Sequence, residues 1–299
     1  MVVVFGSINL DLIFSLPKIP LAGETVLGPS TRIEPGGKGA NQAVAAARDG
    51  ARVLMAGAIG GDALGAGALV LLRDAGVDLE RVATVEASTG CAAIAVDPAG
   101  NNAIAVGSGA NLLARGAGVE DSVLGPGTTL VLQMEVAAEE TAGLIERARA
   151  LGTRIVLNLA PAAELPETAL RAVDVLVVNE SEGAWLADHL LCGTAAEALA
   201  DRLGVTVVLT RGGDGAQIAG ADGVWHEPAV PVEAIDTTAA GDCFVGVMAA
   251  RLDRGDPLRE AIHRASGAAA LCCTRPGSQG SIPFAADTDA FVGATPSER

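Results

Sequence analysis

The chain of 299 residues is poor in aromatic side chains, in basic residues and in long apolar runs. It has no tyrosine, and only 2% of its residues are aromatic, so few rings are available to stack on a ligand. Lysine and arginine number 20 against 36 aspartates and glutamates, a net charge of −16 that argues against nucleic acid as a partner. No apolar run is long enough to span a bilayer, so no membrane partner is expected.

Five cysteines without regular spacing argue against a disulfide framework. The adjacent Cys272 and Cys273 lack the spacing of a zinc or redox pair, and we interpret them as helix-packing residues. The opening segment MVVVFGS has a strand pattern and no basic region, so a secretory signal is not expected. Together these features indicate a reduced, cytoplasmic protein.

The composition suits one large α/β domain over residues 1–299, since 50% of the residues are hydrophobic and can bury a sizeable core. Short runs rich in valine, isoleucine and leucine predict buried parallel strands at Val2–Phe5, Arg52–Ala56, Thr129–Gln133, Arg154–Leu159, Val175–Val178 and Val205–Leu209. Helical patterns such as Glu139–Ala150 and Ala195–Leu203 lie between them. The alternation predicts an α/β fold with a doubly wound, mostly parallel sheet flanked by helices.

Two regions interrupt this alternation. Cys91–Val96 and Asn102–Val106 flank the segment DPAG, which predicts a hairpin turn. Leu10–Ile33 contains strand-like segments but no helical pattern. We therefore expect a small β-sheet, formed by about residues 10–33 and 90–107, that stands off the main sheet.

The stretch Asp236–Asp242 reads DTTAAGD and precedes CFVGVMAARL, whose apolar residues recur at helical spacing. Small residues let a ligand approach the backbone, and the first N–H groups of a helix have no partner inside it, which makes an anion site. A carboxylate beside that site suits general-base chemistry, in which Asp242 takes a proton from a hydroxyl that attacks phosphorus. An ordinary N-cap and turn, with Asp236 or Thr237 as the cap, fits the same residues.

A second glycine-rich stretch, Gly36–Asn41, reads GGKGAN and leads into the segment QAVAAARDG. Two glycines predict a tight turn, and the alanine-rich run behind it is expected to be helical and to end at Gly50. The spacing is not that of a P-loop. A glycine-rich helix start packed against a strand is the alternative, but the polar Lys38 and Asn41 favour a ligand with several hydroxyl groups.

These two stretches resemble the two signatures of the PfkB family of carbohydrate kinases, and within that family the sequence is most similar to the ribokinase group. Other segments carry the resemblance in the same order along nearly the whole chain: GSINLD at Gly6–Asp11, GETV at Gly23–Val26, LQME at Leu132–Glu135, LNLAPAAELP at Leu157–Pro166, VNESE at Val178–Glu182 and TRPGSQGSIP at Thr274–Pro283. The resemblance implies ATP-dependent phosphorylation of the primary 5-hydroxyl of D-ribose to ribose 5-phosphate.

The resemblance also implies which residues hold the sugar and catalyse the transfer. Sugar contacts are implied for Asn9, Asp11, Gly37, Lys38, Gly39, Asn41, Glu135 and Asp242, whose carboxylates and amides suit neighbouring hydroxyls. Asp242 is implied to be the general base, with the backbone N–H groups of Ala239, Ala240 and Gly241 stabilising the phosphoryl charge. Taken alone, Asn9 and Asp11 fit a turn after the first strand, and Glu135 fits a solvent-facing strand end.

The same resemblance implies an ATP site in the second half of the chain. The motif formed by Asn179 and Glu182 is implied to hold Mg²⁺ and the phosphates through water, although by itself it is also typical of a helix cap. Nucleotide contacts are implied for Asn179, Glu182, Thr210, Arg211, Gly212, Gly213, Asp214, Gly215, Gly241 and Ser266. A plain glycine hairpin is the alternative for the segment TRGGDG. Because aromatic residues are so few, we expect aliphatic side chains to enclose the adenine.

Finally, the resemblance implies a K⁺ ion and a homodimer. The implied cation positions, mostly backbone carbonyls, are Asp236, Thr238, Cys272, Arg275, Gly277 and Ser281. Asp236 is the side chain that matters, because a carboxylate oxygen suits a hard cation. The small sheet is implied to cover the sugar as a lid and to make the dimer contact.

Three alternatives to a ribose kinase stay open at this point. A kinase for 2-deoxyribose, fructose or adenosine would need only modest changes to the pocket. A non-catalytic sugar sensor on the same fold would be favoured by the loss of Asp242, which is present. A dinucleotide-binding oxidoreductase would need a GxGxxG motif after the first strand, where Gly6 is followed by SINLD instead.

Overall fold

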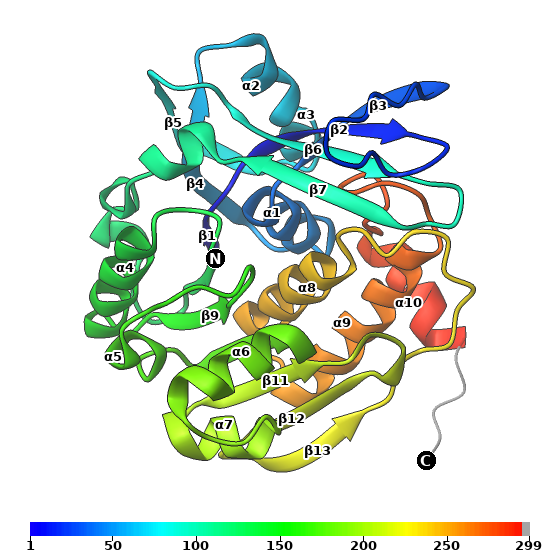
Figure 1. Cartoon of the computed structure of the whole chain (residues 1–299). Helices are drawn as coiled ribbons and strands as arrows, with labels where there is room; N and C mark the ends of the chain where they lie inside the picture. The colour runs from blue at the N-terminus through cyan, green and yellow to red at the C-terminus, as the bar shows by residue number, and fades with distance from the viewer. Residues whose placement is uncertain (295–299) are drawn as a thin grey trace.

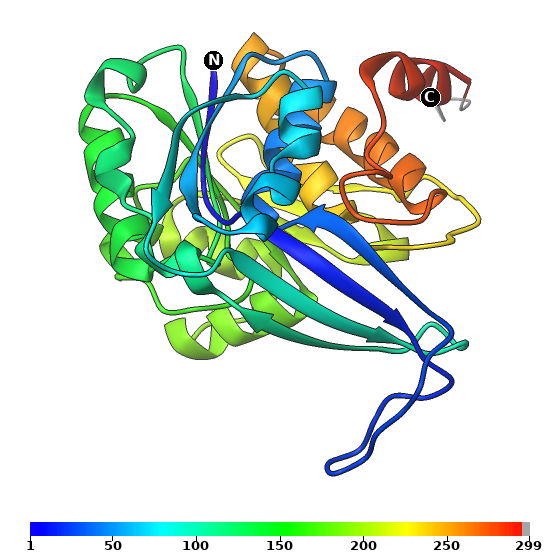
Figure 2. The ribbon, with the colours of Figure 1, turned by 90° about the horizontal axis from the view of Figure 1, so that it is seen from above.

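The structure of the chain is a computed structural model in which residues 1–294 are described. A large β-sheet runs through the middle of the molecule with helices on both faces (Figure 1), and a smaller sheet projects from the body (Figure 2). The expected α/β fold, with a mostly parallel sheet and a separate small sheet, is therefore confirmed. Within the same residues, none of the helices has the length and apolar character needed to cross a membrane.

The large sheet has nine strands within the described residues, in the order β13-β12-β11-β10-β9-β8-β1-β4-β5. Neighbouring strands are parallel from β11 to β5, and β12 and β13 are added antiparallel at one edge. The bounds are β1 Val2–Phe5, β4 Val53–Gly60, β5 Asp78–Val85, β8 Thr129–Leu132, β9 Arg154–Asn158, β10 Val175–Asn179, β11 Thr206–Thr210, β12 Ala216–Gly220 and β13 Gly223–Glu227.

Helices connect the parallel strands and cover both faces of the sheet (Figure 1). Their bounds are α1 Lys38–Arg48, α2 Ala63–Ala68, α3 Val70–Asp74, α4 Ala138–Ala150, α5 Glu167–Leu170, α6 Glu180–Leu190, α7 Ala196–Leu203, α8 Ala240–Arg254, α9 Leu258–Cys273 and α10 Ala285–Ala294. Short 3-10 turns occur at Gly109–Leu113, Gly116–Gly118, Asp121–Val123 and Gly212–Asp214.

Strand β1 lies in the interior of the sheet and separates two hydrophobic cores. Successive side chains of a strand point to opposite faces. Val2 and Val4 accordingly join the core formed with α1, α8 and α9, and Val3 and Phe5 join the core formed with α4, α6 and α7. All four side chains are fully buried, as expected for a parallel strand covered on both faces.

The small sheet has the order β3-β2-β6-β7, with bounds β2 Asn9–Ser15, β3 Ser30–Gly36, β6 Gly90–Val96 and β7 Asn102–Gly107. Strand β2 follows β1 closely in the chain, and it pairs antiparallel with β3 and parallel with β6. In this register Asp11 lies opposite Glu34, and Asn9 lies opposite Gly36. The inner end of the small sheet therefore carries polar groups next to the glycine-rich turn that precedes α1.

Each strand expected from the valine-rich runs is present, most of them within one residue of the expected ends. Strand β4 continues to Gly60, beyond the expected end at Ala56. Strands β5, β12 and β13 were not expected. The sequence of β5, DLERVATV, mixes charged and apolar residues and is only partly buried, so it lacks the continuous apolar pattern of an interior strand.

Candidate active site

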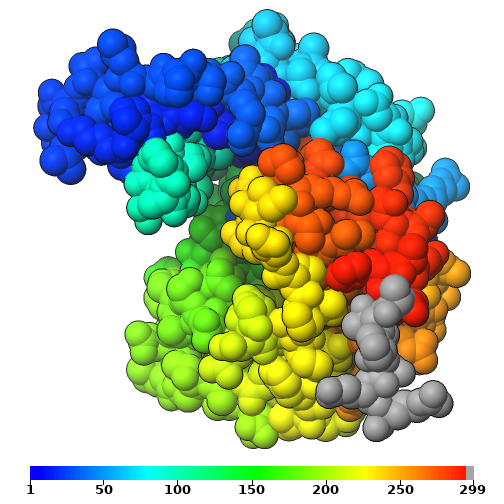
Figure 3. Space-filling model, turned by 90° about the vertical axis from the view of Figure 1, so that its right-hand side faces the viewer, coloured from blue at the N-terminus to red at the C-terminus, as the bar shows by residue number. Residues whose placement is uncertain are grey.

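The candidate site lies where β1, β8, β9, β10 and β11 end, which is where ligands bind in open α/β sheets. The first turns of α1, α6 and α8 meet at the same place. In the space-filling view the strands of the small sheet overhang a recess above the green and yellow segments of the body (Figure 3). A pocket of about 210 Å³ lies there, and it is lined by Lys38, Asn158, Ala160, Val177, Asn179, Glu182, Thr210, Thr237, Ala239, Gly241, Asp242 and Val245.

Asp242 is in the first turn of α8 and is only 6% exposed. Both of its carboxylate oxygens accept hydrogen bonds from amide side chains of α1. Asn41 Nδ2 donates to Oδ2 at 2.8 Å, and Gln42 Nε2 donates to Oδ1 at 3.0 Å. The carboxylate is therefore held in one orientation beside the pocket, as a positioned proton acceptor requires.

The backbone before Asp242 turns sharply into the helix. Ala239 has a φ of 60°, in the left-handed region that residues with a Cβ seldom adopt. The Ala240 N–H donates to the Thr237 carbonyl at 3.2 Å, while Gly241 and Asp242 lie in the first helical turn, where N–H groups have no acceptor inside the helix. Of the three backbone N–H groups expected to face an anion, that of Ala240 therefore already donates to a carbonyl oxygen of the turn.

The glycine-rich turn fits tightly against the end of β1. A Cβ on Gly39 would lie 2.7 Å from Gly6 C and Ser7 N, and Gly37 has a φ of 88° that favours glycine. The Lys38 N–H donates to Glu135 Oε2 at 3.0 Å, and the Ser7 hydroxyl donates to the same oxygen at 2.6 Å. The turn is therefore fixed to the ends of both β1 and β8.

Lys38 is half-buried, and several carboxylates act on its ammonium. The Asp242 carboxylate is the main reason why the pKa of Lys38 is raised, and Glu135 and Glu182 act in the same direction while burial opposes them. Lys38 therefore stays positively charged between the groups expected to hold the sugar and those expected to hold the phosphates. A cation at this position suits the charge that develops during phosphoryl transfer.

Asn9 and Asp11 extend from β2 toward this turn. Asn9 Oδ1 accepts from Asn111 Nδ2 at 2.7 Å, which leaves the Asn9 amide nitrogen free to donate elsewhere. Asp11 is 7% exposed, and its Oδ1 has no hydrogen-bond partner within the described residues. Burial, followed by the nearby Glu135, Glu34 and Asp242, raises the pKa of Asp11 from 3.8 to about 7. An orphaned buried acceptor of this kind suits a ligand that brings a hydroxyl donor.

Asn179 and Glu182 form a capping box at the start of α6. Glu182 N–H donates to Asn179 Oδ1 at 2.9 Å, and Asn179 N–H donates to Glu182 Oε2 at 2.8 Å. The helix-cap reading of this motif is therefore present in the structure. Both side chains also line the pocket that contains Lys38 and Asp242, and burial raises the pKa of the Glu182 carboxyl.

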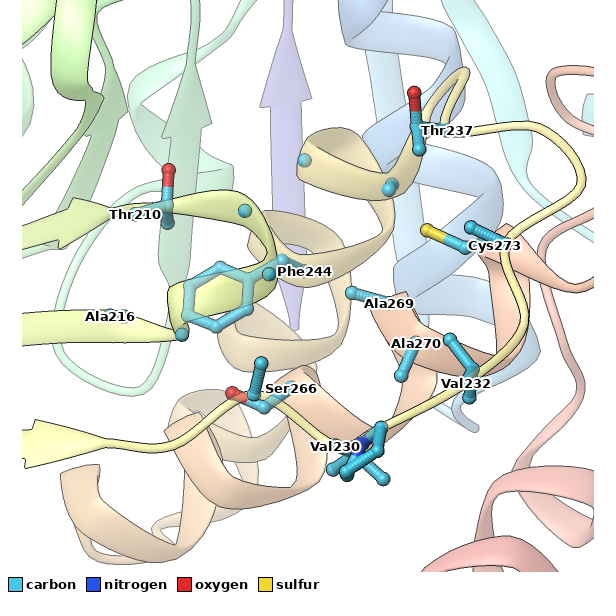
Figure 4. A pocket seen from close by; sticks show the side chains of 18 residues that line it. Thr210, Ala216, Val230, Val232, Thr237, Phe244, Ser266, Ala269, Ala270 and Cys273 are labelled. Atoms are coloured by element: carbon cyan, nitrogen blue, oxygen red, sulfur yellow. The ribbon is translucent and has the colours of Figure 1, made fainter.

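A second, larger pocket of about 440 Å³ adjoins the first, and Thr210, Thr237 and Gly241 line both. It includes Thr210, Gly212, Gly213, Gly215 and Ser266 of the expected nucleotide set, together with the wall Ala229–Val232. Its mostly apolar lining suits a nucleotide base. Figure 4 shows Phe244 of α8 among the side chains of this pocket, so one aromatic ring is available beside the expected aliphatic ones.

Two members of the expected nucleotide set, Arg211 and Asp214, line neither pocket. The Arg211 guanidinium pairs with Glu180 at 3.4 Å and is 45% exposed. Asp214 lies in the 3-10 turn Gly212–Asp214 and is exposed. Of the contacts expected from TRGGDG, the structure thus brings Thr210 and three glycines to the pocket.

The six positions expected to hold a monovalent cation lie around the loop Thr274–Ser281. Thr238 N–H donates to Asp236 Oδ1 at 2.9 Å, and Gly277 N–H donates to Oδ2 at 3.0 Å. Burial alone would raise the pKa of Asp236, but these hydrogen bonds lower it, so the carboxylate is ionised. Cys272 Sγ and Ser281 Oγ lie 3.0 Å apart, whereas the Arg275 side chain pairs with Asp287 at 3.3 Å. Across residues 1–294 there is no cluster of three or more His, Cys, Asp or Glu residues that could hold a metal ion.

Sequence reasoning missed several residues that the structure adds to the site. Gln42 and Asn158 contact each other and belong to the surroundings of Asp242, and Asn111 orients Asn9. Thr237 and Phe244 line the pockets. Gln42 directly follows the GGKGAN segment, and Thr237, Asn158 and Phe244 lie in or beside segments already quoted, so their positions were usable signals, whereas no sequence pattern marks Asn111.

Comparison with known proteins agrees with this geometry. The family model for the pfkB family of carbohydrate kinases matches residues 1–285. The chain is 35% identical over 297 residues to the ribokinase of Haemophilus influenzae, with 97% of each chain covered. Two solved structures are similar over 98% of this chain and 99% of theirs: a Thermotoga maritima ribokinase, at 30% identity and a TM-score of 0.88, and an Arabidopsis thaliana ribokinase complexed with ribose and ATP, at 26% identity and 0.86. The chain, with its buried Asp242 at the start of α8 and its glycine-rich turn before α1, belongs to the PfkB family of carbohydrate kinases.

Proposed function

We propose that the protein phosphorylates the primary 5-hydroxyl of D-ribose with ATP, giving ribose 5-phosphate and ADP. The observation that carries this proposal is the placement of Asp242 at the smaller pocket. The Asn41 amide donates to its carboxylate from the first turn of α1, and Asp242 lines that pocket together with Lys38, Thr237 and Gly241. The Arabidopsis thaliana ribokinase complexed with ribose and ATP, which is similar over nearly the whole chain, supports ribose and ATP as the two substrates.

The sugar would be held by the buried polar groups at the inner end of the small sheet. Asp11 offers an unpartnered carboxylate oxygen, and Asn9 offers a free amide nitrogen. Lys38, Asn41 and Glu135 supply a cation, an amide and a second carboxylate from the opposite side. Such a mixed set of donors and acceptors suits adjacent hydroxyl groups, each of which can both donate and accept.

In the transfer step, Asp242 would accept the proton of the 5-hydroxyl as its oxygen forms a bond to the γ-phosphorus and ADP leaves. The free N–H groups at the start of α8, with Gly241 foremost, would stabilise the charge on the moving phosphoryl group. Because the transition state of phosphoryl transfer is loose, positioning and charge supply most of the rate enhancement.

Mg²⁺ would be held near Glu182 and Asn179 through water and the ATP phosphates. These side chains line the smaller pocket without forming a cage, which suits an ion that binds few protein ligands and relies on substrate phosphates. Mg²⁺ would neutralise phosphate charge. K⁺ would lie near the ionised Asp236 and the loop carrying Gly277, where it would stabilise the backbone that leads into α8.

We further propose that the chain is one ribokinase-like domain acting in the cytoplasm as a homodimer. The small sheet would close over the sugar and make the dimer contact. Ile33, Ile104 and Val106 of this sheet are exposed at 62%, 56% and 51%, so strands β3 and β7 present apolar side chains that a second copy could cover.

The proposal is tested by measuring ADP release with Mg²⁺-ATP, K⁺ and a panel of D-ribose, 2-deoxyribose, fructose and adenosine. A clear preference for D-ribose is expected. Turnover of another acceptor of the panel would be consistent with the same mechanism, and the small sheet would then determine the substrate specificity. ATP binding without turnover on any acceptor would contradict the kinase proposal and favour a sugar sensor.

A further inference from the structure

Gln42 lies directly after the glycine-rich turn, in α1, and has no exposed surface. Its Nε2 donates to Asp242 Oδ1 at 3.0 Å and to Asn158 Oδ1 at 3.1 Å. Its Oε1 accepts from Gln133 Nε2 at 2.8 Å. The amide of Gln42 therefore uses both of its N–H donors and its oxygen inside the protein.

The side-chain amides of Gln42 and Gln133 can be oriented in only one way. An ionised carboxylate only accepts hydrogen bonds, so Asp242 requires the nitrogen of Gln42 to face it. The oxygen of Gln42 then faces Gln133, which has to present its own nitrogen. As a result Gln133 Oε1 is left buried without a partner, close to Gly6, where a Cβ would lie 1.8 Å from it. An unpaired buried acceptor is unfavourable, so the orientation that serves Asp242 prevails over the local preference of Gln133.

We propose that Gln42 is a positioning residue for Asp242, fixing the plane of the carboxylate so that its free lone pairs face the sugar hydroxyl. The proposal rests on the kinase function proposed above. Gln133 acts one step further away, since it fixes the direction of the Gln42 amide. Both side chains have no exposed surface, so the sugar would not contact them.

The nearby Lys38 explains why such a restraint is needed. The Asp242 carboxylate is the largest contributor to the raised pKa of Lys38, and both side chains line the smaller pocket, so the carboxylate and the ammonium lie close together. A carboxylate free to rotate would turn toward that ammonium and form an ion pair, in which it accepts protons poorly. With Oδ1 anchored by Gln42, Asp242 stays oriented toward the pocket while Lys38 remains available to the phosphates.

The decisive variant is Gln42→Glu, studied over a pH series. When protonated, the new carboxyl group still donates to Asp242 Oδ1, but when ionised it repels Asp242. Because two adjacent carboxylates share a proton, they titrate as a pair. The ratio of parental to variant kcat is expected to grow by about tenfold from about pH 6 to pH 9, with the KM for ATP changed by less than about threefold.

Three further variants separate positioning from packing. Gln42→Met keeps the volume but removes the donor, so kcat is expected to fall about tenfold at every pH. Gln133→Met removes the donor to Gln42 Oε1 and leaves Gln42 itself unchanged. A smaller, pH-independent loss in kcat of about two- to fivefold is expected. Gln217→Glu, in the half-buried part of β12, is the matched charge control and should keep the parental pH profile.

Melting temperature and ATP binding are measured for each variant to verify folding. A constant ratio of kcat across pH in Gln42→Glu, together with parental kcat in Gln133→Met, would make Gln42 a packing residue and overturn the inference. If the Gln42 variants do not fold, Gln133→Met alone decides, since an unchanged kcat contradicts the proposal. Failure of the parent to turn over any sugar would instead overturn the proposed function, and the inference with it.

Discussion

Asn41 and Asp242 are joined by a hydrogen bond of 2.8 Å across 201 positions of the chain. The bond connects the first turn of α1 to the first turn of α8. Close approach of the two helices permits it, because a Cβ on Gly246 of α8 would lie 2.4 Å from the Gln42 carbonyl oxygen of α1. The groups expected to hold the sugar and the expected base are therefore positioned by the same helix contact.

Asp242→Asn is expected to lower kcat by about 10²–10⁴-fold, the usual range for loss of a general base. The variant keeps the shape of the side chain, so ATP affinity should change little. Steady-state ADP release measures the rate, and calorimetric titration with ATP is the control. A variant with near-parental kcat would show that Asp242 is not the proton acceptor.

The affinity for the sugar is expected to fall as the pH decreases through about 7. Asp11 has a pKa raised to about 7 by burial and by neighbouring carboxylates, so below that pH its carboxyl is protonated and loses acceptor capacity. The KM for ribose measured between about pH 6 and pH 8 checks this. In Asp11→Asn the KM should be high and should not follow this titration; an equally steep rise in that variant would assign the effect to another group.

Asp11 should also lower the stability of the ligand-free protein at neutral and alkaline pH. A carboxyl whose pKa is raised on folding stabilises the fold while it is protonated, and that contribution is lost as the pH rises from its ordinary value of 3.8 through about 7. Asp11→Asn is therefore expected to melt roughly 2–4 °C higher than the parent at pH 8. The gain should disappear near pH 4, and a gain of equal size at both pH values would point to a cause other than titration.

Gly39→Ala should remove sugar binding by displacing α1 from the end of β1. The added Cβ would lie 2.7 Å from backbone atoms of Gly6 and Ser7, which cannot move without shifting β1. Gly143→Ala, in an exposed part of α4 with nothing within 4 Å, is the matched control and should stabilise the fold by about 0.5–1 kcal/mol. Urea unfolding and the KM for ribose distinguish the two, and a parental KM in Gly39→Ala would refute the packing argument.

Asp236→Ala is expected to abolish activation by K⁺. The carboxylate binds the Thr238 and Gly277 amides and so holds the loop Thr274–Ser281 against the segment that leads into α8. Rates of the parent in K⁺ and in Na⁺-only buffer are compared with those of the variant. Equal rates of the parent in the two buffers would contradict the K⁺ proposal, and a variant that still responds to K⁺ would remove Asp236 from it.

The buried parallel strands could be predicted because their environment is uniform. Val2–Phe5 is covered on both faces, so each position is apolar and the whole run stands out from its surroundings. Strands β12 and β13 could not be predicted in the same way. They lie at the edge of the sheet, carry mixed residues such as Gln217 and His226, and form because β11 offers a free side for antiparallel pairing.

The residues of the candidate site also differ in whether they could be predicted from the sequence. Short glycine- and alanine-rich stretches contain Lys38, Asn41 and Asp242. An ordinary helix start does not require such stretches, so the sequence itself indicates a ligand site there. Gln42 and Asn158 are buried amides within a regular helix and strand, and only the contact between α1, β9 and α8 reveals their role. A sequence rule that reads one segment at a time cannot detect a hydrogen bond between segments far apart in the chain.

The interior position of β1 has a consequence for synthesis on the ribosome. Strand β1 is synthesised before either of its neighbours, β4 and β8. Its four side chains, which are fully buried in the folded protein, therefore lack their packing partners until those strands have been synthesised. Because α8 follows every strand of the large sheet in the sequence, most residues of the two cores are synthesised before Asp242. Catalytic competence would then be acquired only after the strands of the large sheet have been synthesised.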